Sequence, residues 1–126
     1  MKHLFVPYDI ALALKEKGFD ESCLAFYYGQ LKKLEIGFNW LSEGCRNSLI
    51  ESFIAAPLYQ QVCDWFREKH NIHIDVSHWR KQPVGDEIWD NCYQTFINGD
   101  AGDVSIFRTY YEALTKAIEE ALKLIP

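Results

Sequence analysis

Residues 57–76 constrain the fold most, because their hydrophobic period changes from that of a helix to that of a strand. In the first part, side chains recur at helical steps along one side of the predicted helix. This side carries Leu58, Val62, Trp65, Phe66 and Lys69. Pro57 suits a first helical turn, and Asn71 can adopt the left-handed conformation that ends a helix. From Ile72 onward, apolar and polar residues alternate. The sequence therefore predicts a helix that leads directly into a strand.

Upstream of this unit, the sequence predicts a short helix and a hairpin. Residues 8–17 have helical spacing, and Gly18 can close that helix. Residues 23–28 are apolar at both odd- and even-numbered positions, which is typical of a strand covered on both faces. Residues 34–40 alternate cleanly, so the two runs predict a pair of antiparallel strands. Residues 48–55 leave two interpretations open, a short helix or an irregular segment.

The strand that begins at Ile72 is expected to pair with a later strand. A turn signal at residues 82–86 separates it from the returning strand at residues 88–97. We predict that Ile74 lies opposite Tyr93, because this register best separates apolar from polar side chains. One face then carries Ile72, Ile74, Val76, Trp89, Tyr93 and Ile97. The other face carries His73, Asp75, Ser77, Asp90, Cys92 and Gln94.

The C-terminal segment predicts the last helix of the chain. Apolar side chains recur at steps of three and four over residues 107–125, and Ser105 can cap this helix. The predicted order is helix, two strands, helix, two strands, helix. We therefore expect an α+β fold: a mostly antiparallel sheet of about four strands, built from two hairpins, with helices packed on one face. No linker divides the chain, so residues 1–126 are predicted to form a single domain.

Composition restricts the classes of function. The net charge of −5 argues against a nucleic-acid partner, whose phosphates require a basic surface. No apolar run approaches the length of a membrane span, and the first residues lack the apolar run of a signal peptide. The cysteines Cys23, Cys45, Cys63 and Cys92 lack the spacing of a metal finger or a redox motif. We expect free thiols, no cofactor, no membrane partner and a cytoplasmic location.

Two helical segments carry a resemblance to a known group of proteins. Ala56–Ile72 and Tyr110–Leu122, together with Phe5-Val6-Pro7-Tyr8, resemble small hypothetical proteins of Bacteroidetes phages and prophages. The resemblance does not extend to residues 31–53. That group has no assigned activity, so the resemblance assigns no catalytic residue. It implies an accessory protein of a mobile element in a bacterial cytoplasm.

A set of polar residues on the second predicted hairpin suggests a metal site. His73 and Asp75 lie two positions apart on one strand, so they project to the same face and can supply two ligands. Asp90 or Cys92 on the neighbouring strand can supply a third. Cys92 with His73 and Asp75 also contains the residue types of a nucleophilic site. The alternative interpretation is the solvated side of an ordinary strand.

Aromatic side chains suggest a binding surface instead. Trp79 at the end of a strand and Tyr59 beside the buried helical stripe are expected to be partly exposed. Exposed aromatic residues next to polar groups are typical of protein interfaces. Our leading hypothesis is a protein-binding or self-associating module, with a partner protein or a homodimer. The alternative is a small metal-dependent or hydrolytic enzyme that uses the face with His73 and Asp75.

Overall fold

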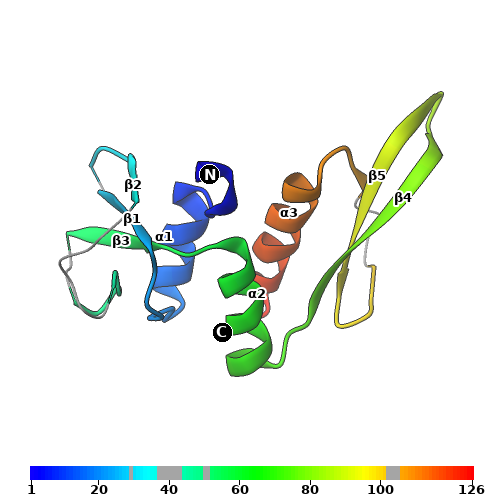
Figure 1. Ribbon diagram of the computed structural model, residues 1–126. Coiled ribbons are helices and arrows are strands. Elements are labelled where there is room, and N and C mark those ends of the chain that lie inside the picture. The colour runs from blue at the N-terminus through cyan, green and yellow to red at the C-terminus, as the bar shows by residue number, and fades with distance from the viewer. Residues whose placement is uncertain (29, 37–43, 50–51, 102–105) are drawn as a thin grey trace. The chain divides into compact units, whose positions relative to one another are not determined.

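The computed structural model describes residues 1–28, 30–36, 44–49, 52–101 and 106–126 (Figure 1). Their contacts divide the chain into two compact units, Met1–Trp65 and Phe66–Pro126. The predicted α+β class is confirmed, because helices and antiparallel sheets make up both units. The single sheet of about four strands is corrected, since the described residues form two three-stranded sheets. The single domain over residues 1–126 stays a prediction.

The first unit contains one three-stranded sheet with a helix packed on it. Its elements are the short helix η1 (Lys2–Leu4), α1 (Tyr8–Glu16), β1 (Ala25–Tyr28), β2 (Leu34–Ile36) and β3 (Phe53–Ala56). The strand order is β2-β1-β3, and α1 packs against β3. The predicted first helix and first hairpin are confirmed, with Phe26 opposite Glu35. The part of the second predicted strand after Ile36 lies outside the described residues.

Strand β3 corrects the prediction of a short helix or an irregular segment over residues 48–55 at residues 53–55, whereas residues 50 and 51 lie outside the described part of the chain. All four of its residues are buried, and Phe26 of β1 lies opposite Ala55. A strand covered on both faces lacks the apolar–polar alternation that reveals strands in a sequence. This burial explains why the pattern of the segment did not indicate a strand.

The second unit contains the other sheet and the last helix. Helix α2 (Tyr59–His70) begins in the first unit and ends in the second. It is followed by β4 (Ile74–Val84), β5 (Glu87–Ile97), β6 (Ile106–Phe107) and α3 (Tyr110–Lys123). Asn71 has a φ of 53° and Ile72 N donates to Phe66 O at 3.0 Å, so the predicted passage from helix to strand is confirmed. The sheet order is β4-β5-β6, and α3 packs against all three strands.

The register of β4 and β5 differs from the predicted one by four positions. Ile74 lies opposite Ile97 rather than Tyr93, because Gly85 and Asp86 alone form the turn. Pro83 therefore belongs to β4 and not to the turn. Val84 and Glu87 flank a two-residue turn. Such a turn places its flanking pair at hydrogen-bonding positions, so Pro83 falls at a position that needs no N–H toward β5. An even shift leaves each side chain on its predicted face.

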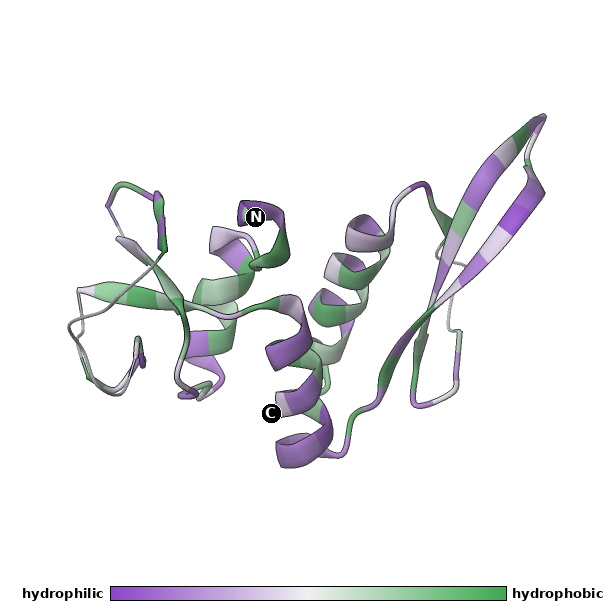
Figure 2. Ribbon diagram, in the orientation of Figure 1, coloured by the Kyte–Doolittle hydropathy of each residue, from purple (hydrophilic) through white to green (hydrophobic). Residues whose placement is uncertain are grey.

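The start of α3 also differs from the prediction. Ile106 and Phe107 form β6 beside β5, with Phe107 opposite Tyr93. The helix begins at Tyr110, and Thr109 Oγ1 accepts a hydrogen bond from Glu112 N at 3.2 Å. Thr109 is therefore the N-cap, whereas Ser105, the predicted cap, lies outside the described residues. Figure 2 shows hydrophobic residues on α3 and on the half of the β4–β5 hairpin that lies away from its turn (the inner half). The half next to the turn at Gly85 and Asp86 (the outer half) is largely hydrophilic.

Candidate interaction site

The observed register separates the residues of the predicted metal site. Asp75 lies opposite Phe96, and Cys92 lies opposite Trp79. Four strand positions correspond to about 13 Å, so Asp75 and Cys92 are too far apart to share a metal ion. Asp90 lies two positions farther along β5, toward the tip of the hairpin. Among the described residues, no group of three or more His, Cys, Asp or Glu side chains could hold a metal.

His73 is engaged at the base of the hairpin. Its backbone N donates to Asn98 Oδ1 at 2.8 Å, and its O accepts a hydrogen bond from Asn98 N at 2.8 Å. Its ring Nε2 lies 3.3 Å from Asn71 Oδ1. These contacts give His73 a role in holding the two strand ends together. The arrangement does not bring it toward Cys92 as a catalytic base.

An open hollow of about 520 Å³ lies along the outer part of β5. Its lining residues are Glu87, Ile88, Trp89, Asp90, Asn91 and Arg108. Arg108 stacks over the ring of Trp89 at 4.2 Å, and Glu87 Oε2 accepts from Arg108 Nη2 at 2.9 Å. Trp89 Nε1 donates to the same oxygen at 3.0 Å. The polar groups of Glu87, Trp89 and Arg108 are thus hydrogen-bonded or stacked with one another. We interpret these contacts as stabilising the surface of the hairpin, and not as a catalytic pocket.

The two predicted binding residues have different surroundings. Trp79 is 50% exposed on β4, as expected. Tyr59 is only 7% exposed, so the expectation of partial exposure was wrong. Tyr59 precedes Val62 by three positions and Phe66 by seven, which places it on the buried stripe of α2. Of the two predicted binding residues, Trp79 is therefore the one that is accessible to a partner.

Strand β4 has a long open edge. In the sheet order β4-β5-β6, ten of its eleven residues pair with β5, and no described strand pairs with its other side. Asn98 N donates to His73 O, so the odd-numbered residues from His73 to Trp79 direct their backbone groups toward β5. The even-numbered residues from Ile74 to Arg80 direct theirs away from β5. The inner half of β4 thus presents an ordered row of hydrogen-bonding groups.

The outer half of this edge is blocked. Lys81 has a φ of 51°, and its pair with Asp90 is missing from the ladder. A two-residue turn places the pair that flanks it, Val84 and Glu87, at hydrogen-bonding positions, so we infer that the alternation changes phase at Lys81. Pro83 consequently lies at an outward-facing position and has no N–H to donate. Proline and charged residues are common devices that prevent strand addition at sheet edges.

Charges of opposite sign lie at the two ends of the open edge. Asp75 lies near the start of β4, whereas Arg80 and Lys81 end its regular part, and all three side chains are exposed. The sequence predicted Trp79 but not this edge, since edge position depends on the order of strands in the sheet. The basic residues Arg80 and Lys81 next to a predicted strand were the sequence signal that could have indicated an edge strand.

The comparisons with known proteins add no family for this chain. No protein-family model, no curated protein and no solved structure matches it. Among the described helices, none combines the length and the apolar composition needed to span a lipid bilayer. The resemblance of Ala56–Ile72 and Tyr110–Leu122 to phage proteins stays a prediction.

Proposed function

We propose that this protein is a self-associating module, in which the inner halves of two β4 strands pair in antiparallel fashion. The observation that carries the proposal is the open edge of β4 from Ile74 to Arg80, beside a blocked outer edge. An exposed strand edge is a template for pairing with another chain. The setting of a mobile-element protein in a bacterial cytoplasm, which the sequence resemblance implies, stays a prediction.

The backbone of β4 allows several centres for this pairing, among them Ser77 and His78. In a two-fold symmetric antiparallel pair, residues that face the partner must lie opposite other residues that face the partner. Pairing centred on His78 meets this condition, because Val76 of one copy then lies opposite Arg80 of the other. Both residues direct their backbone groups to the open edge. The paired segment also ends before Pro83.

Charge and aromatic side chains select His78 among these centres. Asp75 of each copy lies opposite Lys81 of the other, so two pairs of opposite charge form across the new ladder. The two Trp79 side chains occupy a diagonal pair on one face, where positions about 7–8 Å apart are within reach of aromatic rings. Association would therefore cover part of an indole that is 50% exposed in the single chain.

The small free-energy contributions of the cross-strand pairs predict a modest affinity for the β4–β4 dimer. Each cross-strand pair contributes roughly 0.2–1 kcal/mol, and a short paired segment must also offset the loss of translational freedom. We therefore expect a dissociation constant in the range of roughly 1 μM to 1 mM, which corresponds to about 8 to 4 kcal/mol. Exposed charge pairs are screened by salt, so association weakens as ionic strength rises.

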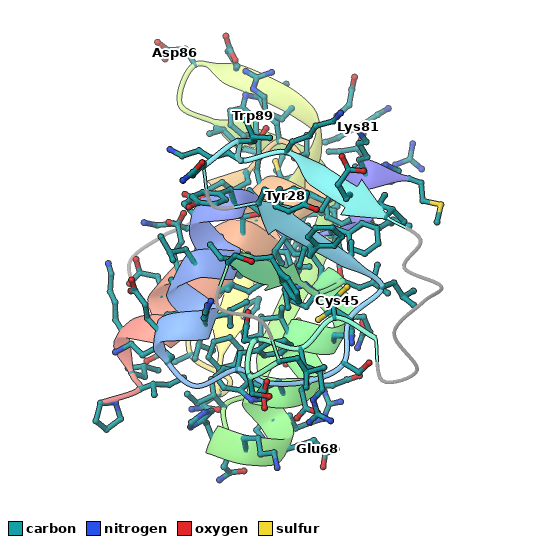
Figure 3. All side chains as sticks on the ribbon, turned by 90° about the vertical axis from the view of Figure 1, so that its left-hand side faces the viewer. Tyr28, Cys45, Glu68, Lys81, Asp86 and Trp89 are labelled. Carbon is teal, nitrogen blue, oxygen red and sulfur yellow. The ribbon has the colours of Figure 1, made fainter. Side chains whose placement is uncertain are left out.

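Light scattering over a concentration series tests the proposal. The wild-type chain should change from monomer to dimer, and Asp75→Lys should weaken this association by tenfold or more because it places two lysines opposite each other. Asp86→Lys is the matched control, since it makes the same charge change at the tip of the same hairpin (Figure 3). A wild-type chain that stays monomeric at millimolar concentration contradicts the proposal. Equal weakening by both substitutions also contradicts it, because net charge alone would then explain the effect.

A further inference from the structure

Two buried cysteines of the first unit lie directly opposite each other. Cys23 N donates to Cys45 O at 2.9 Å, and Cys45 N donates to Cys23 O at 3.0 Å. Residues that exchange both backbone hydrogen bonds have Cα atoms about 5.5 Å apart and project to the same side of the ladder. This separation lies within the range of about 4.4–6.8 Å that disulfides span. Both cysteines are free thiols in the structure.

Other hydrogen bonds hold the two cysteine segments together. Arg46 donates to Asp20 O from Nε at 3.1 Å and from Nη2 at 2.9 Å. Asn47 Nδ2 donates to Phe19 O at 2.8 Å, and Ser48 N donates to Asp20 Oδ1 at 2.8 Å. On one side of the Cys23–Cys45 pair, residues 19–20 and 46–48 are therefore fixed against each other. The fold therefore holds the backbones of the two cysteines opposite each other, while the Cys23 thiol donates to Glu21 O at 3.4 Å.

We propose that Cys23 and Cys45 form a dithiol–disulfide couple that a low-molecular-weight disulfide oxidises while Cys63 and Cys92 stay reduced. The thiolate of one cysteine attacks a sulfur of the small disulfide, which forms a mixed disulfide and releases one small thiolate. The thiolate of the second cysteine then attacks the protein sulfur of that mixed disulfide and releases the second small thiolate. The protein loses two electrons and two protons, and the small disulfide becomes two thiols.

Burial controls the rate of this exchange. Both cysteines are almost fully buried, with exposed fractions of 1% for Cys23 and 0% for Cys45. Burial, with a smaller effect of Cys45, raises the pKa of the Cys23 thiol to about 12, and burial also raises the pKa of Cys45. Because the thiolate is the nucleophile, the folded pair reacts slowly at neutral pH. Exchange should accelerate when the two segments separate transiently or when the pH rises.

Redox titration of the full chain tests this proposal. The protein is equilibrated with graded ratios of reduced to oxidised glutathione, alkylated, and analysed by peptide mass spectrometry without reduction. We expect one linked peptide pair, Cys23 with Cys45, and alkylated Cys63 and Cys92. Cross-linking across residues 24–44 should raise the melting temperature of the oxidised chain by roughly 5–15 °C.

Variants provide the controls for this titration. Cys63→Ala should retain the linked peptide and the rise in melting temperature, and Cys45→Ser should lose both. The wild-type result alone decides the proposal if the second variant fails to fold. Glutathione adducts at Cys23 or Cys45 without an internal bond would overturn the proposal. Scrambled linkages that include Cys63 or Cys92, or unreacted thiols under oxidising conditions, would overturn it as well.

Discussion

Gly44 lies next to the segment that contains Ser22 and Cys23. Its φ is 71°, and a Cβ atom there would collide with the side chain of Ser22 and lie 3.0 Å from Cys23 O. Gly18 has a similar backbone, with a φ of 92°, but a Cβ atom there meets nothing within 4 Å. The two glycines therefore share a left-handed conformation and differ in the space around them.

This contrast yields a prediction at the residue scale. Gly44→Ala should lower the free energy of unfolding by about 2–4 kcal/mol, because it combines left-handed strain with a collision. Gly18→Ala should cost only about 1 kcal/mol, from the backbone term alone. Urea unfolding of both variants measures the difference. Equal losses would show that the Cys45 segment does not approach Cys23 as closely as described.

Residue identity predicted exposure well in one case and poorly in another. Trp79 is exposed because it lies on a strand that has no neighbour on one side among the described residues. Tyr59 is buried because three- and seven-residue steps connect it to Val62 and Phe66. The helical spacing that predicted α2 already contained that information about Tyr59. The exposure of Trp79, in contrast, depends on the neighbours of its strand.

At the scale of elements, the N-cap of α3 gives a second prediction. Thr109→Ala should lower the free energy of unfolding by about 1 kcal/mol, since it removes the oxygen that accepts from Glu112 N. Thr109→Ser keeps that oxygen and should recover most of the loss. Thermal unfolding followed by circular dichroism measures both variants. If serine were no better than alanine, the hydroxyl would not be what caps α3.

The helices and the first hairpin could be predicted from hydrophobic spacing, whereas the second register could not. One signal favoured the wrong register, and the other could not exclude it. Pro83 has the composition of a turn, although its missing N–H costs nothing at an outward-facing position of an edge strand. The alternation of side chains repeats every two residues, so it cannot distinguish registers that differ by four. Only the two-residue turn at Gly85–Asp86 fixes the choice.

The register also determines whether the residues of the candidate metal site lie close together. In the predicted register Asp75 lies opposite Cys92, and His73 is next to both. In the observed register Cys92 lies opposite Trp79, four positions away from the partner of Asp75. A predicted site that combines residues from two strands therefore depends on the predicted register between those strands. The sequence supplied residues of the right chemical types but not their separation.

At the scale of the whole molecule, each unit is a small structure. The units span residues 1–65 and 66–126, and each contains a three-stranded sheet with a helix packed on it. Units of this size bury only about 60% of the surface that their unfolded chain exposes. In the second unit, β4 and β5 extend beyond α3 as a ribbon of two strands (Figure 1). Since isolated two-stranded ribbons are marginal in water, pairing of the inner half of β4 with a further strand would stabilise the base from which this ribbon extends.

A mixing experiment with two charge-reversal variants tests the proposed pairing of β4 most directly. In Asp75→Lys, each contact between residues 75 and 81 of the two copies joins two lysines, and in Lys81→Asp it joins two aspartates. Both residues are exposed, so neither substitution should disturb the fold. Each variant alone should associate at least tenfold more weakly than the wild-type chain. Their equimolar mixture restores opposite charges at both contacts, so analytical ultracentrifugation should find a heterodimer near wild-type affinity. A mixture that associates no better than either variant alone would contradict the antiparallel pairing of β4.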